Sequence, residues 1–341
     1  MVSHHSEQQI GNDLLVLRDA NPWSAIIKDT FMNKTHWNYA EIPQTLLNIS
    51  ATLASGQCFR WQLQDHGEWH GVIGNEFVRI RPHENGFYWQ TFPNANNWET
   101  LETYFRLDVD LGSLIKMWAI RDVESKECFE TNTGIRILKQ SPHEALFSFL
   151  CASNNSIMKI RKSVSLLAER VGVKVHEFEG KSHYSFPQPE AILSLTEIQL
   201  RQDMWGFRAP YVVNMAKFLS NQSGDWLDSL ASLSYIDAHC ELVKLHGIGA
   251  KLADCISLFG LGFDEAVPVD THIRQIALRK FGPQTGVKSL TANEYKAVAS
   301  RFQELYGPYA GWAQQYLFYD ELNVSTTQNK MAEISRKHRE A

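Results

Sequence analysis

The sequence predicts an α+β protein in which an antiparallel sheet precedes a helical part. Between about residue 45 and residue 90, aromatic and β-branched residues alternate with polar ones, as in "GEWHGVIGNEFVRI", which is typical of strands with one buried face. From residue 141 to about residue 325, apolar residues recur at helical spacing without a convincing strand alternation. No repeat or low-complexity linker separates the two parts, so we expect them to pack tightly.

Composition limits the classes of function. The chain has 341 residues, of which 44% are hydrophobic, and its net charge is −5. An acidic chain is unusual among nucleic-acid-binding proteins, so such binding would need a local basic surface. The five cysteines are scattered and include no Cys-x-x-Cys, which argues against a disulfide framework or a zinc site and favours an intracellular location. No apolar run reaches about 18 residues, so no membrane contact is expected.

The first part of the chain is divided into an N-terminal extension, residues 1–40, and an α+β domain, residues 41–140. The sequence predicts no fold for the extension. Within the domain, strands are expected over about 45–90, and the dipeptide Asn85-Gly86 predicts a β-hairpin. Residues of about 98–130 have helical spacing, with Leu101 and Leu111 among the apolar anchors.

The second part is expected to be a helical domain, residues 141–325, followed by a basic C-terminal tail, residues 326–341. Ser141 predicts a helix cap, Pro142 occupies the first helical position, and Glu144 would close a capping box. The helical pattern continues to about residue 170, and several further helices follow.

The segment "LHGIGAKLAD", residues 245–254, predicts two helices joined by a tight turn at Gly247 and Gly249. Glycine permits positive φ and lets the backbone approach another surface closely. The amide groups at the start of the second helix form a ready site for an anion such as phosphate. Taken alone, Gly-x-Gly fits a packed helical corner equally well.

Lys251 lies in the first turn of the second helix, where the helix dipole disfavours a cation. This position and burial would both lower the pKa of the amine, and a neutral lysine amine can attack carbon to form a Schiff base. Cys255, four residues further on, shares the same helix face. The alternative, true of most lysines, is a side chain whose amine reaches solvent.

Asp270, in "VPVDTH", precedes an apolar-periodic helix and is expected to be its N-cap, a role worth about 1 kcal/mol. A carboxylate at this position could also balance a nearby amine or a cation that develops during a reaction. The two roles do not exclude each other.

These segments together resemble the helix-hairpin-helix DNA glycosylase superfamily. Three more, "SGQCFRW" (55–61), "FSFLCASNN" (147–155) and "GPYAGWAQQYLF" (307–318), are similar to the eukaryotic type of 8-oxoguanine DNA glycosylase/lyase, over roughly residues 45–322. The resemblance implies an antiparallel-sheet (TBP-like) domain packed on a helical helix-hairpin-helix domain. It also implies a monomeric, bifunctional base-excision repair enzyme that acts on double-stranded DNA containing 8-oxoguanine and requires no cofactor or metal.

The resemblance implies a mechanism in which the damaged nucleotide is flipped out of the duplex into a pocket. Lys251 would attack the anomeric carbon of the sugar and expel the base, and the resulting Schiff base would undergo β-elimination that cuts the strand. Asp270 would stabilise the positive charge that develops on the sugar.

Base recognition also follows from the resemblance. Guanine has a lone pair on N7, where 8-oxoguanine carries a hydrogen, so a fixed backbone carbonyl attracts the lesion and repels the normal base. The resemblance assigns this carbonyl to Gly56. It assigns the sandwich around the base to Cys255 and Phe318, and the contact with its pairing edge to Gln314.

For the DNA itself, the resemblance implies that Asn154 fills the gap left by the flipped nucleotide and meets the orphaned cytosine, which Arg208 also contacts. His272 would lie near a phosphate, and the amides around Gly247 and Gly249 would hold another.

The chain departs from the family pattern at the face expected to meet the opposite base. Lys159 stands where the family has a second arginine, and it lacks the planar fork that reads cytosine with two hydrogen bonds. Phe207 replaces a tyrosine, and Phe259 is bulkier than the residue expected near the pocket. An acidic protein would bind DNA through a local basic face, for which the sequence offers Lys159, Arg161, Lys162, Arg208 and Arg274.

Other functions remain open at this point. A glycosylase for oxidised pyrimidines or mispaired adenine commonly carries an iron–sulfur cluster, but no cysteine follows Cys255. An alkyl-base glycosylase would usually lack the hairpin lysine. A non-catalytic DNA-binding module or a helical protein-binding scaffold would not need both Lys251 and Asp270. Within the cell, the nucleus, the mitochondrion and the bacterial cytoplasm are all compatible with the sequence.

Overall fold

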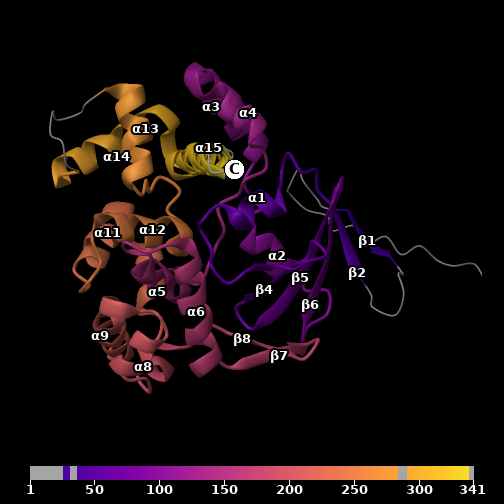
Figure 1. The fold of residues 1–341 in the computed structure, drawn as a ribbon, viewed down its shortest axis with the longest axis vertical. Coiled ribbons are helices and arrows are strands. Elements are labelled where there is room, and N and C mark those ends of the chain that lie inside the picture. Colours follow the sequence, from indigo (N-terminus) through magenta and orange to yellow (C-terminus); the bar gives the residue numbers. More distant parts are fainter. Residues whose placement is uncertain (1–25, 31–36, 283–289, 338–341) are drawn as a thin grey trace, which may run out of the picture.

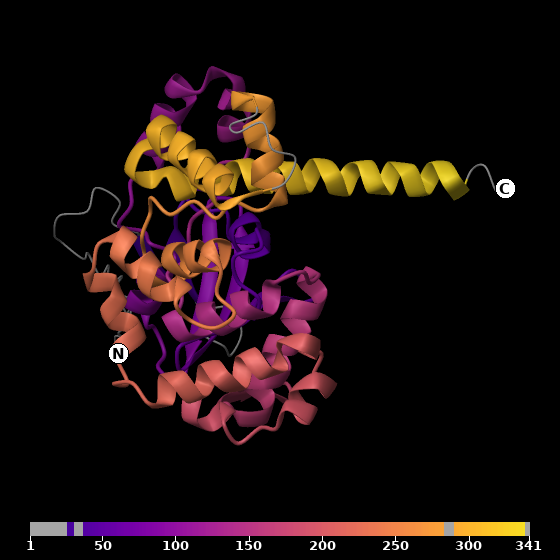
Figure 2. The same ribbon diagram turned by 90° about the vertical axis from the view of Figure 1, so that its left-hand side faces the viewer.

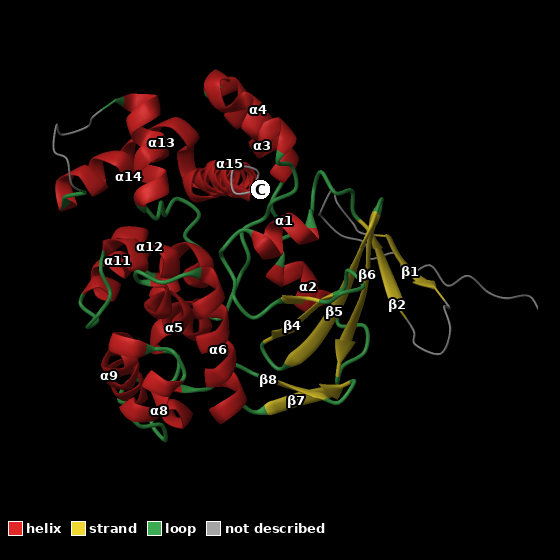
Figure 3. Cartoon of the chain, in the orientation of Figure 1, coloured by secondary structure: helices red, strands yellow, loops and turns green. Residues whose placement is uncertain are grey.

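The computed structural model describes residues 26–30, 37–282 and 290–337 and shows the expected α+β architecture (Figure 1; Figure 3). A six-stranded antiparallel sheet has the order β1-β2-β6-β5-β4-β3, and a separate hairpin pairs β7 with β8. The strands are β1 (Ile26–Thr30), β2 (Trp37–Glu41), β3 (Gln62–Leu63), β4 (Trp69–Ile73), β5 (Glu76–His83), β6 (Gly86–Phe92), β7 (Lys174–Phe178) and β8 (Lys181–Tyr184).

Helices make up most of the rest of the described chain, and none of them is both long and apolar enough to cross a membrane. The α-helices are α1 (Ile49–Ala54), α2 (Trp98–Tyr104), α3 (Leu111–Arg121), α4 (Lys126–Thr131), α5 (Pro142–Ala152), α6 (Ile157–Val171), α7 (Pro189–Ile192), α8 (Glu197–Gln202), α9 (Ala209–Ser220), α10 (Trp226–Ser229), α11 (Tyr235–Val243), α12 (Ala250–Ile256), α13 (Thr271–Phe281), α14 (Ala292–Tyr306) and α15 (Ala310–Lys337).

The region predicted to be all strand, about 45–90, contains a helix. Asn48 caps α1 through a 3.0 Å hydrogen bond from the Ala51 amide. The predicted hairpin between β5 and β6 is confirmed, but its two turn residues are Glu84 and Asn85. Gly86 is the first residue of β6, where a Cβ would lie 2.0 Å from the Ala40 carbonyl oxygen on β2. The lack of a side chain at Gly86 therefore lets β6 pack closely against β2, and Gly86 does not form the turn.

The two faces of the sheet are covered differently. Val78 and Ile80 of β5 point to one face and belong to the apolar core that α1 and α2 close. Phe77 and Arg79 alternate with them and point to the opposite face, where Arg79 lies 4.1 Å from the Phe178 ring of β7.

The β7–β8 hairpin was not predicted, since no strands were expected after residue 170. Its turn consists of Glu179 and Gly180, which have φ of 50° and 74°, and the His183 ring of β8 stacks on Phe77 at 3.9 Å. The strands are short and partly exposed, so they lack a strong apolar alternation. Because the hairpin follows α6 in the chain yet contacts β5, it ties the helical part to the sheet.

The boundary expected at residue 140 does not divide the two apolar cores. The sheet core draws on residues 40–107 and Leu138, whereas α3 and α4 contribute Trp118 and Phe129 to the helical core. Figure 1 shows α3 and α4 beside α15, and the Trp118 ring lies 5.8 Å from Tyr316 of that helix. The predicted tight packing of the two parts is thus confirmed.

The ends of the expected domains also differ from the structure. Residues 1–25 of the N-terminal extension lie outside the described residues, but β1 and β2 belong to the sheet. The expected C-terminal tail continues α15 as far as Lys337, and this helix projects from the rest of the molecule (Figure 2).

The start of α5 is confirmed at Pro142, but Ser141 makes no side-chain capping bond and no capping box forms. Glu144 instead accepts a 3.0 Å hydrogen bond from Arg60, which anchors the "SGQCFRW" segment to α5.

Candidate active site

The glycine turn between α11 and α12 has the expected geometry. Gly247 has φ of +91°, and a Cβ there would lie 3.0 Å from the Tyr211 ring. Gly249 is the N-cap of α12 and has open space where a Cβ would stand. No side chain caps the first amides of α12, so they remain available to an anion.

A narrow pocket brings together the two predicted catalytic residues and the four predicted base-binding residues. It has a volume of about 50 Å³, far below the roughly 300–1,000 Å³ usual for ligand pockets. The residues that line it are Gly56, Phe149, Lys251, Cys255, Phe259, Pro268, Asp270, Gln314, Gln315 and Phe318. They come from the sheet part, from α5, from α12 and its continuation, from the start of α13, and from α15.

Lys251 points into this pocket from the first turn of α12. Its amine lies 5.7 Å from the centre of the Phe149 ring, within range of a cation–π interaction. Phe149 in turn stacks on Phe259 at 5.3 Å. Phe259 was expected near the pocket, whereas Phe149 was not singled out from the sequence.

The predicted lowering of the pKa of Lys251 is wrong. Burial does lower it, but Cys255 and Asp270 raise it by more, so the pKa lies above its ordinary value. Burial raises the pKa of the Cys255 thiol to about 11. The raised pKa of Lys251 favours the protonated amine, whereas attack on carbon needs the neutral amine.

Asp270 is the N-cap of α13, as predicted. Its Oδ1 accepts a 2.9 Å hydrogen bond from the Ile273 amide, and the carboxylate also lines the pocket beside Lys251. One side chain thus serves both the helix and the pocket.

Gly56 and Gln314 present unused hydrogen-bonding groups. Gly56 has φ of +82°, and no donor among the described residues reaches its carbonyl. The adjacent Ser55 carbonyl accepts a 2.8 Å bond from Gln315. Gln314 is 3% exposed, and its Oε1 has no hydrogen-bond partner within the described chain. An unsatisfied buried amide oxygen is costly, so this atom is able to accept a further hydrogen bond.

Phe318 forms the opposite wall of the pocket from α15. Its ring meets His272 edge-on at 5.8 Å. This contact places His272, the predicted phosphate neighbour, beside a residue that lines the pocket.

Arg208 is hydrogen-bonded to the loop after α5. Asn154 is exposed and has φ of +52°. Arg208 is 5% exposed and donates to the carbonyls of Ser153 at 2.9 Å and Asn154 at 2.8 Å. Its guanidinium also lies 4.2 Å from the Phe207 ring, which is 55% exposed. Arg208 therefore holds the loop that presents Asn154, and its donors are largely occupied.

The expected basic face is smaller than predicted. Lys159 and Lys162 are exposed on α6, and Arg161 is partly buried. Arg274 instead forms a 2.9 Å ion pair with Glu294. Of the five residues predicted for this face, the two lysines are the ones with exposed side chains.

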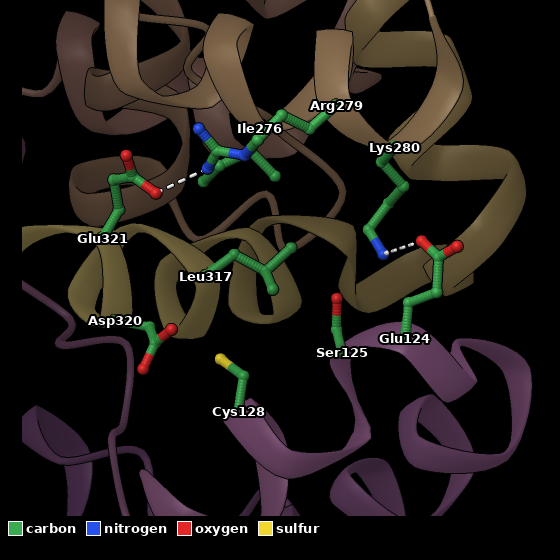
Figure 4. Close-up of a pocket in the computed structure, with 9 residues that line it drawn as sticks. All are labelled: Glu124, Ser125, Cys128, Ile276, Arg279, Lys280, Leu317, Asp320 and Glu321. Carbon is green, nitrogen blue, oxygen red and sulfur yellow. Dashed lines mark hydrogen bonds and ion pairs between the residues drawn. The ribbon is translucent and has the colours of Figure 1, made fainter. Parts of the chain in front are cut away.

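A second cavity, of about 250 Å³, lies between α4, α13 and α15 (Figure 4). Its charged residues already pair with each other: Arg279 with Glu321 at 2.6 Å, and Lys280 with Glu124 at 3.6 Å. None of the residues in the Lys251 pocket lines this cavity, so the two are separate.

One group of side chains has the spacing of metal ligands. His66, Glu68 and His70 bring their ligand atoms within 4.8 Å of one another. Glu68 is nevertheless bound by Arg79 at 2.7 Å and also by Arg81. Two guanidinium groups on the same carboxylate disfavour a divalent cation there.

Comparison with known proteins identifies the family. Residues 40–146 match the model of the 8-oxoguanine DNA glycosylase N-terminal domain. An N-glycosylase/DNA lyase of Arabidopsis thaliana is 32% identical over 300 residues, 85% of this chain and 82% of the relative. One of Saccharomyces cerevisiae is 29% identical over 343 residues, 87% of this chain and 89% of the relative.

Among solved structures, the Clostridium acetobutylicum 8-oxoguanine glycosylase/lyase, bound to double-stranded DNA with cytosine opposite 8-oxoguanine, superposes with a TM-score of 0.76. The two are 29% identical, and the match covers 88% of this chain and 98% of the other. The chain therefore belongs to the 8-oxoguanine DNA glycosylase/lyase family of base-excision repair enzymes.

Proposed function

We propose that Lys251 and Asp270 are the catalytic residues with which this chain excises 8-oxoguanine opposite cytosine and then cuts the DNA strand. The observation that carries the proposal is the single pocket that unites Lys251, Asp270, Gly56, Cys255 and Gln314. A DNA-binding module without chemistry would have no use for a lysine and an aspartate in the same narrow pocket.

The chemistry starts when the Lys251 ammonium passes a proton to water, which leaves a neutral amine. The amine then bonds to the anomeric carbon, while the bond from that carbon to the base breaks and its electron pair leaves with the base. As the bond to the base breaks, positive charge grows on the sugar, and the Asp270 carboxylate stabilises it. Opening of the sugar ring gives a Schiff base between Lys251 and the anomeric carbon. Removal of a proton from the neighbouring carbon then expels the 3′ phosphate, which cuts the strand.

The pocket also supports discrimination between 8-oxoguanine and guanine. The N7 hydrogen of the lesion would donate to the Gly56 carbonyl, where guanine would bring a lone pair against it. The unsatisfied Oε1 of Gln314 would accept a hydrogen bond from the pairing edge of the base. Cys255 and Phe318 would lie on its two faces. Because the pocket is narrow, Phe318 has to move aside as the base enters.

On the DNA, we propose that Asn154 occupies the gap and that Arg208 fixes the Asn154 loop from behind. Lys159 and Phe207 would meet the duplex near the opposite base, and the amides at Gly247 and Gly249 would bind a phosphate, with His272 nearby. The enzyme would act as a monomer inside the cell. Because Lys251 supplies the nucleophile, no step requires a cofactor.

The test is reductive trapping. The protein is incubated with a duplex that contains one 8-oxoguanine opposite cytosine, and borohydride is added to reduce any Schiff base to a stable adduct. We expect an adduct with the wild-type chain and none with Lys251→Gln, although both bind the duplex. An adduct that persists in Lys251→Gln would show that another amine is the nucleophile. Binding without an adduct in the wild type would contradict the lyase step.

A further inference from the structure

A series of buried hydrogen bonds connects the helix that carries Lys251 to the segment that carries Asp270. Asp254 lies on α12, one turn after Lys251, and is 1% exposed. Its carboxylate accepts a 2.6 Å hydrogen bond from the hydroxyl of Tyr235 on α11 and a 2.5 Å bond from that of Tyr295 on α14. Asp254 does not line the pocket, so its role there has to be indirect.

Unlike the Tyr235 hydroxyl, the Tyr295 hydroxyl also contacts the segment before α13, where the Val267 carbonyl lies 3.4 Å away. The Tyr295 hydroxyl also accepts a 3.2 Å hydrogen bond from the backbone amide of Val269, the residue directly before Asp270. Val269 is 1% exposed, so water cannot readily replace this partner. A single oxygen atom of Tyr295 therefore joins α12 to the start of α13.

The residue next to Tyr295 adds a second contact to the same segment. Glu294 is 1% exposed and accepts a 3.0 Å hydrogen bond from Nε of Arg274, in the first turn of α13. Two adjacent residues of α14 thus contact the chain on both sides of Asp270: Tyr295 binds the Val269 backbone before it, and Glu294 binds the Arg274 side chain after it.

We propose that Tyr295 is a positioning residue for base excision, whose hydroxyl fixes the Asp270 carboxylate relative to the Lys251 amine. The inference rests on the catalytic roles proposed above for those two residues. Displacing a reacting group by about 1 Å can slow an enzyme about 10²-fold, so even a small shift of the Val269 backbone should be measurable.

Tyr295→Phe and Tyr235→Phe form a matched pair. Each removes one hydroxyl that donates to Asp254, but only the first removes the partner of the Val269 amide. Both variants are compared at a temperature where circular dichroism shows them folded. The measurements are the single-turnover excision rate at saturating enzyme, the affinity for a duplex with an uncleavable abasic analogue, and hydrogen exchange of the Val269 amide.

For Tyr295→Phe we expect excision to slow about tenfold or more with an affinity within about twofold of wild type, and for Tyr235→Phe a loss below about threefold. The Val269 amide should exchange faster in Tyr295→Phe alone. Equal losses in the two variants, a wild-type rate for Tyr295→Phe, or unchanged exchange at Val269 would each overturn the inference.

Two further variants keep the test decisive. Asp270→Asn is assayed alongside, because a wild-type rate for that variant would refute the proposed role of Asp270 itself, whereas failure of Tyr295→Phe alone refutes only the positioning role. If Tyr295→Phe does not fold, Glu294→Gln weakens the neighbouring contact with Arg274. It should then slow excision by about threefold or more at unchanged affinity, and no change would overturn the inference.

Discussion

Asp270 caps a helix and has a proposed chemical role, and two substitutions separate the two. Its Oδ1 caps α13 through the 2.9 Å bond from the Ile273 amide. Asp270→Asn keeps a side-chain oxygen for this bond, and asparagine is as good an N-cap as aspartate. Asp270→Ala removes the cap, which should cost about 1 kcal/mol of unfolding free energy, or about 2 °C in Tm for a chain of this length.

Both substitutions remove the carboxylate from the pocket. Loss of one electrostatic partner of a transition state typically costs about 3–4 kcal/mol, so excision should slow by roughly 10²–10³-fold in each variant. The assay is single-turnover excision with excess enzyme, together with thermal unfolding of the same preparations. We therefore expect equal losses of rate but unequal stabilities.

The pH dependence gives an independent check. Asp270 raises the pKa of Lys251, so Asp270→Asn should lower it and increase the fraction of neutral amine at a given pH. Trapping on a preformed abasic site, which needs no base excision, should then reach its half-maximal rate at lower pH than in the wild type. Wild-type excision by Asp270→Asn would show that the carboxylate only caps the helix. Unchanged stability of Asp270→Ala would show that the cap bond contributes nothing.

Three other predictions concern parts of the molecule outside this pair. Burial lowers the pKa of His183 from 6.5 to about 4. Between these pH values His183 is protonated in the unfolded chain but neutral in the folded one, so the free energy of unfolding should fall as pH drops from 6.5 towards 4. Allowing for partial solvent exposure, the loss of unfolding free energy is about 2 kcal/mol. Urea unfolding at the two pH values should show this loss in the wild type. The loss should be smaller in His183→Phe, which keeps a ring stacked on Phe77. Gln314→Leu fills the same space without an amide, so it should retain stability but lose about tenfold in excision of 8-oxoguanine; an unchanged rate would mean that Gln314 does not contact the base. Arg208→Met should leave the Ser153 and Asn154 carbonyls without donors and loosen the loop, weakening affinity for duplex DNA by about tenfold; faster amide exchange at residues 153–156 is the check, and unchanged exchange would contradict it.

Local signals predicted the centre of the site well. The four-residue spacing of Lys251 and Cys255 places them on one helix face, and the extended segment before Asp270 makes it an N-cap, so neither required knowledge of the rest of the molecule. The hairpin glycines and the start of α5 at Pro142 follow from the same kind of backbone argument.

Other features depend on which groups meet in space. Spacing along the chain does not show that Arg208 binds a backbone loop or that Arg274 pairs with Glu294. The predicted sign of the pKa shift of Lys251 was wrong because Cys255 and Asp270 together outweigh burial, and spacing along the chain does not give the distance to Asp270. The β7–β8 hairpin packs against Phe77 and Arg79 of β5, which are about a hundred residues earlier in the chain, so its own residues gave little sign of it.

The narrowness of the Lys251 pocket also bears on side reactions of its amine with small aldehydes and ketones. An exposed neutral amine would condense with such metabolites and be lost to the reaction. Here Cys255 and Asp270 raise the pKa of the amine, which favours its protonated form, and the amine lies in a space of about 50 Å³. In the function proposed above, both the proton and the surrounding walls would shield Lys251 until a flipped nucleotide enters. The raised pKa and the narrow pocket would thus slow the attack on DNA, but they would also limit condensation of Lys251 with small carbonyl compounds while no DNA is bound.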